Sequence, residues 1–502
     1  MVKIERGAGE LFKQIWVIAM AYFGVTVGAG FASGQEVLQY YVSYGVWGIA
    51  GGVLVLVVMP LAAMIILQYG SYFRAQSHGP VFDSVASRLM AKFLDYSLLI
   101  AQFCIGFVML AGAGSNLNQQ FGLPLWVGSA IMVAMVLVSG MWDVNRVTNL
   151  LGIFTPFMVI ILLVAGFYAL SRAPESIDAV NAYATTEVAS PLPTWWMATL
   201  NYVGLCMFSG ISMSFIIGGS NWNPRVAGWG GLIGGLIFAG LLVLLTFGLL
   251  FRVEDVASAD LPTLALVNEI NPVFGTFSAV VIYLMIFATT LGVFYASGKR
   301  LAPDDAQSGS SRKYRITFTV ITLAGFALSF FDFAVLVNNV FPVLGWLGVL
   351  LILVLVATWL LRWRARINEE SRRRARVEEL VSRKLDPEEE FSQDDYAELV
   401  QVARDASVPA DDLRDDVTDY VIGKLDVDDD IDRDEVWADS RYRKLLPGEV
   451  RVVSSAAPVA RAQEWTIDEF DDSWNVPADA PEDGAESAED SGPEVDSETI
   501  KK

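Results

Sequence analysis

Long apolar runs separated by short polar connections dominate the first 363 residues of the chain. A membrane-spanning helix needs about 20 mostly apolar residues, and ten runs approach or exceed this length. They lie at residues 15–41, 46–69, 93–114, 125–141, 147–170, 195–219, 227–251, 274–296, 316–331 and 343–363. The pattern predicts an all-α integral membrane protein with ten transmembrane helices embedded in a lipid bilayer.

The first run is interrupted by small and polar residues. Residues 25–39 read VTVGAGFASGQEVLQ, in which three glycines precede Gln35 and Glu36. Glycine lowers helix propensity, so we expect the backbone to open here between two half-helices. Opened backbone at membrane depth needs partners from protein, water or ligand, because lipid offers no hydrogen bonds. This stretch is therefore a candidate binding site.

Ser33 and Glu36 have the spacing of a capping box. A half-helix starting near Gly34 would then satisfy its own first amides and present the positive end of its dipole to an anion. In the alternative interpretation, Ser33 and Glu36 only cap a kinked helix, and the glycines only permit close packing between helices.

The two halves of the membrane region share one pattern. Each starts with an interrupted run, continues with an unbroken one, and then has a short amphipathic stretch, at residues 81–89 and 261–270. Gly210 corresponds to Gly30, within a second interruption that reads MFSGISMS. Because each half has an odd number of runs, we expect a 5+5 inverted repeat with broken helices 1 and 6, as in many secondary transporters. Alternatively, the small residues around Gly210 only allow tight packing.

Lysine and arginine gather on one side of the predicted helices. They occur before the first run, between the second and third, and between the eighth and ninth, whereas only Arg172 and Arg252 fall on the opposite side. Such residues favour the cytoplasmic side. This predicts a multi-pass protein of the cytoplasmic (plasma) membrane with both termini cytoplasmic.

The formal net charge of −21 comes from the end of the chain. Residues 1–363 carry 16 Lys+Arg and 16 Asp+Glu, whereas residues 364–502 carry 19 and 40. We expect a cytoplasmic acidic tail that is largely disordered, with a short docked helix at 411–424. Its first arginines, at 364–376, suit anionic lipid headgroups. Anionic lipid and a cytoplasmic protein are the alternative tail contacts, and no nucleic-acid partner is indicated.

These boundaries divide the chain into five parts. They are a cytoplasmic leader (1–14), a first five-helix repeat (15–171), an extracellular loop (172–194), a second five-helix inverted repeat (195–363) and the acidic tail (364–502).

The string VGAGFASGQE, followed by the 5+5 pattern, resembles the YkvI-type membrane proteins. That family belongs to the amino acid-polyamine-organocation superfamily, whose members are expected to share the LeuT-like fold. The resemblance covers about residues 10–365 and implies a substrate between the first and sixth helices, with the third and eighth completing the site. The superfamily motif maps onto Gly28, Ala29 and Gly30 in the first helix and Ser209, Gly210 and Ile211 in the sixth.

Other polar and aromatic residues at membrane depth add candidates. Gln102 and Asn201 either line a substrate path or hydrogen-bond between helices, and Phe208 either gates a pocket or packs. The predicted substrate-binding residues are Gly28, Ala29, Gly30, Gln35, Glu36, Gln102, Phe208, Ser209, Gly210 and Ser212.

The resemblance also implies a sodium site. In sodium-coupled members, a hydroxyl pair on the eighth helix joins opened first-helix carbonyls around the ion, which here suggests Thr289, Thr290 and the carbonyl of Val27. Hard oxygen ligands suit an alkali cation. Alternatively, the threonine hydroxyls bond their own helix, and Glu36 carries a proton as coupling ion. No other cofactor is predicted.

The leading hypothesis is a secondary-active transporter that moves a small solute, an amino acid or similar zwitterion, by alternating access. The alternative is a non-transporting membrane sensor or scaffold that binds a ligand in the same fold and signals through the tail. A channel is less favoured, because no ring of repeated polar residues lines one helix. No enzyme is expected: His78, the only histidine, lies in a loop without a recognisable nucleophile or metal partner.

Overall fold

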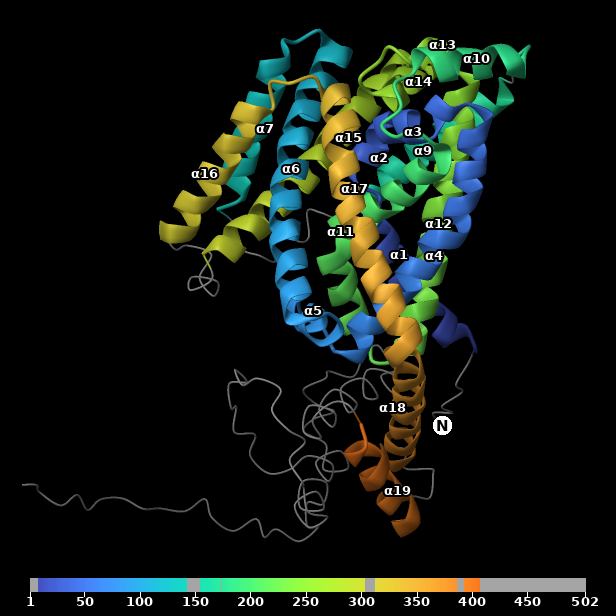
Figure 1. Ribbon diagram of the computed structural model, residues 1–502, viewed down its shortest axis with the longest axis vertical. Helices are drawn as coiled ribbons and strands as arrows, with labels where there is room; N and C mark the ends of the chain where they lie inside the picture. Colours follow the sequence, from blue (N-terminus) through green and yellow to red (C-terminus); the bar gives the residue numbers. More distant parts are fainter. Residues whose placement is uncertain (1–7, 142–153, 173, 303–311, 386–391, 407–502) are drawn as a thin grey trace, which may run out of the picture.

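The computed structural model describes residues 8–141, 154–172, 174–302, 312–385 and 392–406 (Figure 1). Within these ranges every regular element is helical. Six of the described helical segments are long and apolar enough to cross a membrane: Val46–Tyr72, Arg88–Phe121, Trp195–Gly219, Pro224–Phe251, Pro272–Leu301 and Phe333–Arg383. The chain is therefore an all-α, multi-pass membrane protein.

The first half contains the helices α1 (Ala8–Thr26), α2 (Ala29–Ser33), α3 (Gln35–Tyr40), η1 (Val42–Tyr44), α4 (Val46–Tyr72), α5 (Gly79–Val85), α6 (Arg88–Phe121), α7 (Leu125–Ser139) and α9 (Thr155–Ser171). Helix α10 (Ile177–Glu187) lies in the connection, and the second half contains α11 (Trp195–Gly219), α12 (Pro224–Phe251), α13 (Val253–Val256), α14 (Pro262–Ile270), α15 (Pro272–Leu301), α16 (Arg312–Leu328) and α17 (Phe333–Thr358). A π-helical turn, η3 (Trp359–Trp363), leads into α18 (Arg364–Leu385), and α19 (Gln393–Arg404) follows.

Each of the ten predicted runs overlaps helical structure where the structure describes it, and the first run is divided over α1, α2 and α3. The start of the fifth run, residues 147–153, lies outside the described residues. Small residues bring the helices together, as is usual in membranes. Gly235 of α12, for example, faces Pro60 of α4 so closely that a Cβ atom would lie 2.8 Å from the proline Cα.

The two predicted amphipathic stretches form the short helices α5 and α14. They lie at opposite ends of the helix bundle (Figure 1). The start of α1 and the helix α18 lie at the same end as α5, whereas α10 and α13 accompany α14 at the other end (Figure 1).

The predicted break of the sixth helix is wrong, because α11 runs without interruption from Trp195 to Gly219. Ser209 Oγ donates to the Cys206 carbonyl at 3.0 Å, and Ser214 Oγ donates to the Gly210 carbonyl at 2.9 Å. These hydroxyls bond within their own helix, so they do not open its backbone.

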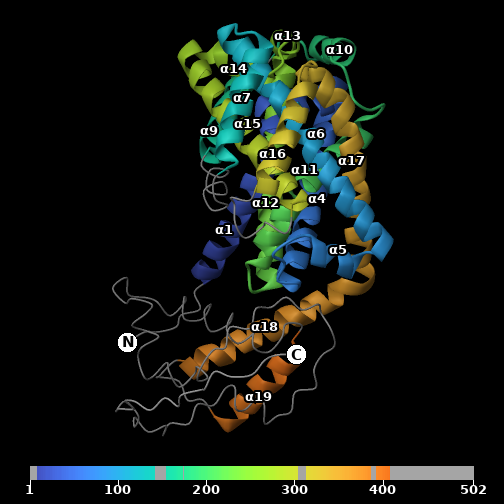
Figure 2. The same cartoon turned by 90° about the vertical axis from the view of Figure 1, so that its left-hand side faces the viewer.

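The tail begins as an ordered arm. Helix α18 continues below the bundle and α19 folds back beside it (Figure 2). Arg374 is fully buried and donates to the carbonyls of Ser71 and Tyr72, at the end of α4, and of Trp222. The expectation that this arginine faces lipid headgroups is therefore wrong. Residues 407–502, including the helix predicted at 411–424, lie outside the described residues.

Candidate functional site

The first membrane segment opens where the sequence predicts it. Helix α1 ends at Thr26, and Gly28 adopts extended backbone with φ −82° and ψ 172° before α2 begins. Gly34, at φ +82°, then separates α2 from α3. The left-handed conformation favours glycine, and a Cβ atom here would also lie 2.8 Å from the backbone nitrogen of Thr263 in α14. Gly34 therefore sets the second turn of the break.

The predicted capping box at this turn is wrong. The residue that precedes α3 is Gly34, which has no side chain to cap the helix. Ser33 instead closes the end of α2: its Oγ donates to the Gly30 carbonyl at 2.7 Å and accepts from the Gln35 N–H at 3.2 Å. Because Gly34, and not Ser33, is the residue that precedes α3, no capping box forms and the Glu36 carboxyl group takes another partner.

That partner is on α11. The Tyr202 hydroxyl donates to Glu36 Oε2 at 3.0 Å, and Glu36 is only 8% exposed. The carboxyl group lies against Gly30, where any Cβ atom would overlap it. The missing side chain of Gly30 thus makes room for the carboxyl group inside the break.

Two glutamines of α3 bring further polar atoms into the interior. Gln35 and Gln39 are 4% and 3% exposed. Gln39 Nε2 donates to the Ala334 carbonyl of α17 at 2.9 Å. The side-chain carbonyl oxygens of both glutamines are buried and have no hydrogen-bond donor within the described residues. Buried acceptors of this kind are rarely left unpaired in proteins, so they suit a bound group that donates.

The predicted residues of α11 do not all gather at the break. Gly210 faces α1, and a Cβ atom there would lie 3.3 Å from Val25 Cγ1. Phe208 is buried in the apolar core, which is the packing alternative. Ser209 is exposed and bonds only its own helix in the described structure. Of these three positions, only Gly210 packs next to the opened segment.

Ser212 lies in a separate polar cluster. Its Oγ is 2.9 Å from His78 Nδ1, and His78 Nε2 is 3.2 Å from Asp95 Oδ1. Arg300 of α15 forms an ion pair with Asp95. His78 therefore has a hydroxyl and a carboxylate as partners, which its loop position in the sequence did not indicate. Burial lowers the pKa of His78, while its hydrogen bond to the Asp95 carboxylate opposes the shift. The cluster ties α11 to α6 and α15 beside α5.

The remaining predicted residues lie on α6, α15 and the end of α1. Gln102 Oε1 accepts from Ser297 of α15 at 3.2 Å, as the interhelical alternative expects. Thr290 Oγ1 donates to the Ile286 carbonyl at 2.7 Å, so its proton is used within α15. Thr289 is half-buried and Val27 is buried. The sodium site of Val27 and the two threonines stays a prediction.

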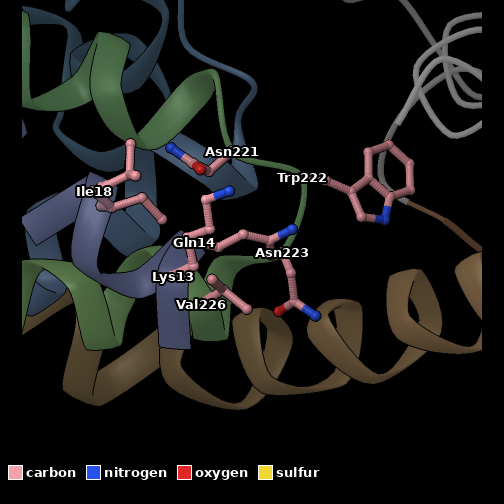
Figure 3. A pocket seen from close by; sticks show the side chains of 8 residues that line it. Lys13, Gln14, Ile18, Asn221, Trp222, Asn223 and Val226 are labelled. Carbon is pink, nitrogen blue, oxygen red and sulfur yellow. The ribbon is translucent and has the colours of Figure 1, made fainter. Parts of the chain in front are cut away.

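A cleft of about 270 Å³ opens elsewhere, between the start of α1 and the connection from α11 to α12 (Figure 3). No predicted site residue lines it. The lining residues are Lys13, Gln14, Val17, Ile18, Asn221, Trp222, Asn223 and Val226. Trp222 also donates through Nε1 to the Arg374 carbonyl at 3.3 Å, so this cleft belongs to the end of the bundle where α18 docks.

Sequence reasoning missed Tyr202, although it noted the neighbouring Asn201. Asn201 Nδ2 donates to the Pro342 carbonyl at 2.8 Å, and its Oδ1 accepts from the Tyr40 hydroxyl at 3.3 Å. This amide is thus the helix-to-helix bridge of the alternative interpretation. A tyrosine inside an apolar run carries no signal of its own, because its ring packs like any aromatic residue.

No protein-family model matches the chain. Among solved structures, the inward-facing conformation of Mhp1 aligns with 70% of this chain and 77% of its own, with 13% identity and a TM-score of 0.45. A structure of the Eremococcus coleocola manganese transporter aligns with 85% and 94%, with 12% identity and a TM-score of 0.39.

Two curated Bacillus subtilis (strain 168) proteins are similar in sequence. The uncharacterized membrane protein YkvI is 22% identical over 335 residues, which cover 66% of this chain and 92% of YkvI. The uncharacterized protein YyaD is 22% identical over 358 residues, which cover 70% of this chain and 100% of YyaD. The resemblance to YkvI-type membrane proteins is thereby confirmed.

Proposed function

We propose that this protein is a secondary-active transporter that moves a small solute, an amino acid or similar zwitterion, across the cytoplasmic membrane by alternating access. The observation that carries the proposal is the opened first helix. It holds an acidic side chain and unpaired polar oxygens inside a membrane-embedded bundle, where such groups are costly and mark functional sites.

The chemistry of the opened segment supports a solute with hydrogen-bond donors. Gln35 Oε1 and Gln39 Oε1 are buried acceptors without donors within the described residues. An ammonium or amide group of a solute would supply those donors. The substrate contacts in the proposal are therefore Gln35 and Glu36, with Gly28, Ala29 and Gly30 giving close approach to backbone and Gly210 closing the site from α11.

The arrangement of the short helices supports the 5+5 inverted repeat and the LeuT-like fold as part of the proposal. Helices α5 and α14 occupy corresponding places in the two halves and lie at opposite ends of the bundle (Figure 1). Inversion of one half relative to the other produces this placement. A cytoplasmic location of α5 and α18 completes the proposed topology.

Uptake of a radiolabelled amino-acid mixture into proteoliposomes tests the proposal. The full chain should accumulate label above empty vesicles, and excess unlabelled amino acid should compete. Gly30→Leu should abolish accumulation, because the added side chain takes the space of the Glu36 carboxyl. Leu89→Ala is the matched control, since that residue is 81% exposed at the start of α6. Absence of uptake for the whole mixture would contradict the proposal for amino acids.

The rival function, a sensor or scaffold that signals through the tail, gives a different result. The ordered contact of Arg374 with the end of α4 and with Trp222 favours keeping it as the second candidate, because it links the tail to the bundle. If the protein is a sensor, a ligand should raise the thermal midpoint of the purified protein, and the same ligand should show no flux into vesicles.

A further inference from the structure

The break contains one acidic side chain with an unusual set of neighbours. Glu36 is 8% exposed and lies between Gly30 of α2 and Tyr202 of α11. The Tyr202 hydroxyl is the hydrogen-bond partner recorded for the carboxyl group within the described residues. No lysine, arginine or histidine of the described residues forms an ion pair with it.

The other titratable groups that face Glu36 are also without positive charge. Tyr40 and Tyr41 come from its own segment, and Tyr202 and Cys206 come from α11. Helices α2, α12, α14 and α17 also pack against α3, and none of their described residues places a cation against the carboxyl group. The negative form of Glu36 therefore has a single hydrogen bond and no opposite charge.

A buried charge without a counter-charge is expensive, and a carboxylate in that position is neutralised by taking up a proton. The alternative counter-ion, sodium, has less support at this position. The Thr290 hydroxyl of the predicted sodium site donates its proton to the Ile286 carbonyl inside α15, and Glu36 has no part in that predicted ligand set.

We propose that Glu36 is the proton-binding site through which the protein couples solute movement to a proton gradient, with Tyr202 as a positioning residue. When the broken segment is shielded from water, Glu36 is protonated and therefore neutral inside the membrane. When the break opens to water, the carboxyl group becomes hydrated and releases that proton. The inference rests on the proposed transport function, but proton binding is measurable without any substrate.

Infrared difference spectroscopy of the full-length protein in liposomes tests proton binding directly. A protonated carboxyl group and a carboxylate absorb infrared light at different frequencies. Exposed acidic side chains are ionised at neutral pH, so they contribute carboxylate bands. We expect a protonated-carboxyl band at neutral pH that disappears in Glu36→Gln and persists in Glu187→Gln, a control at an exposed acid. In Tyr202→Phe the band should remain but change frequency, because its hydrogen bond is lost. An unchanged spectrum in Glu36→Gln would overturn the proposal.

Gradient-driven uptake of the same amino-acid mixture tests coupling. In sodium-free vesicles with an alkaline interior, the full chain should take up label faster than without the gradient. Glu36→Gln should show equal rates with and without the gradient, and Glu36→Asp, which keeps a carboxyl group, should retain some response. A strict sodium requirement would overturn the coupling role.

The two assays separate the two proposals. A Glu36 band without any uptake contradicts the transport function and leaves the proton site standing. Uptake that ignores the pH gradient, together with no Glu36 band, contradicts the proton site and leaves transport standing.

Discussion

The first membrane segment and α11 carry glycine and serine at corresponding positions, yet one opens and the other stays closed. The first segment has Gly34 at φ +82°, whereas no glycine of α11 has a positive φ. Ser209 and Ser214 of α11 bond carbonyls three and four residues earlier in the same helix, and Ser33 of the first segment bonds the Gly30 carbonyl in the same way, so these serine bonds do not separate the two regions. The difference teaches that small and polar residues permit a break, but a left-handed turn and a side chain with a partner elsewhere produce it.

The two regions are also held in different ways. The break is held from inside the bundle, through Glu36 and the Tyr202 hydroxyl. Helix α11 is held at the far end, where Ser212 meets His78 and the following loop meets Arg374 of the tail.

The largest expected effect is at the tail contact that holds the end of α11. Arg374→Met removes the donors for three carbonyl groups and takes from Glu370, which is 1% exposed, its hydrogen-bonded cation, so that the longer contact with Arg373 at 3.9 Å remains. Breaking one partner of a buried pair costs roughly 3–5 kcal/mol. The thermal midpoint of the purified full chain should fall sharply.

Arg372→Met is the control for this change, because Arg372 is exposed on the same helix. Exposed substitutions usually stay within about 0.5 kcal/mol. Replacing Glu370 by Leu as well should recover part of the loss, since the buried carboxylate that Arg374 neutralised is then removed. Equal midpoints for the Arg374 and Arg372 variants would show that the docked arm contributes nothing to stability.

The second prediction compares the two corresponding glycines. Gly30→Ala places a Cβ atom on the Glu36 carboxyl group and should cost roughly 1–3 kcal/mol as overpacking. At Gly210→Ala the new Cβ atom lies 3.3 Å from Val25 Cγ1 and 3.9 Å from Ser214 Oγ, and the change gains up to about 1 kcal/mol of helix propensity. Thermal unfolding of both variants measures the difference. A loss at Gly210 as large as at Gly30 would mean that the two positions are equivalent after all.

The sequence predicted the membrane helices and the site of the break, because apolar run length and glycine placement are local properties. It did not predict that α11 stays whole, since the choice of a serine hydroxyl between its own helix and another partner depends on the neighbouring helices. The same holds for Glu36: its spacing from Ser33 indicated a cap, whereas its actual partner, Tyr202, lies 166 residues further along the chain. Likewise, composition could not show that Arg374 is buried.

The third prediction compares two serines. Ser33 Oγ bonds the Gly30 carbonyl and the Gln35 N–H inside the break, so Ser33→Ala leaves buried backbone groups unpaired and should cost about 1 kcal/mol. Ser209→Ala removes one bond on an exposed face of α11 and improves helix propensity, so it should change stability by less than about 0.5 kcal/mol. Chemical denaturation of both variants checks the ranking, and a reversed order would place the structurally sensitive serine in α11.

The smallest expected effect concerns pH at the cluster that holds Ser212. Burial lowers the pKa of His78 from its ordinary value of 6.5 in the folded protein. As the pH falls through that value, the unfolded chain takes up a proton before the folded one does, so the contribution of His78 to stability is present above about pH 6.5 and declines below it.

His78→Gln keeps a hydrogen-bonding group beside Ser212 but does not titrate. The drop in thermal midpoint between about pH 7.5 and pH 5.5 should therefore be smaller in the variant than in the protein that retains His78. The acidic residues of the tail titrate equally in both proteins and cancel in this difference. If the thermal midpoint falls by the same number of degrees in both proteins, the attachment of α11 does not depend on a neutral His78. The contrast between a helix held at its end and a break held from within the bundle then rests on Arg374 alone.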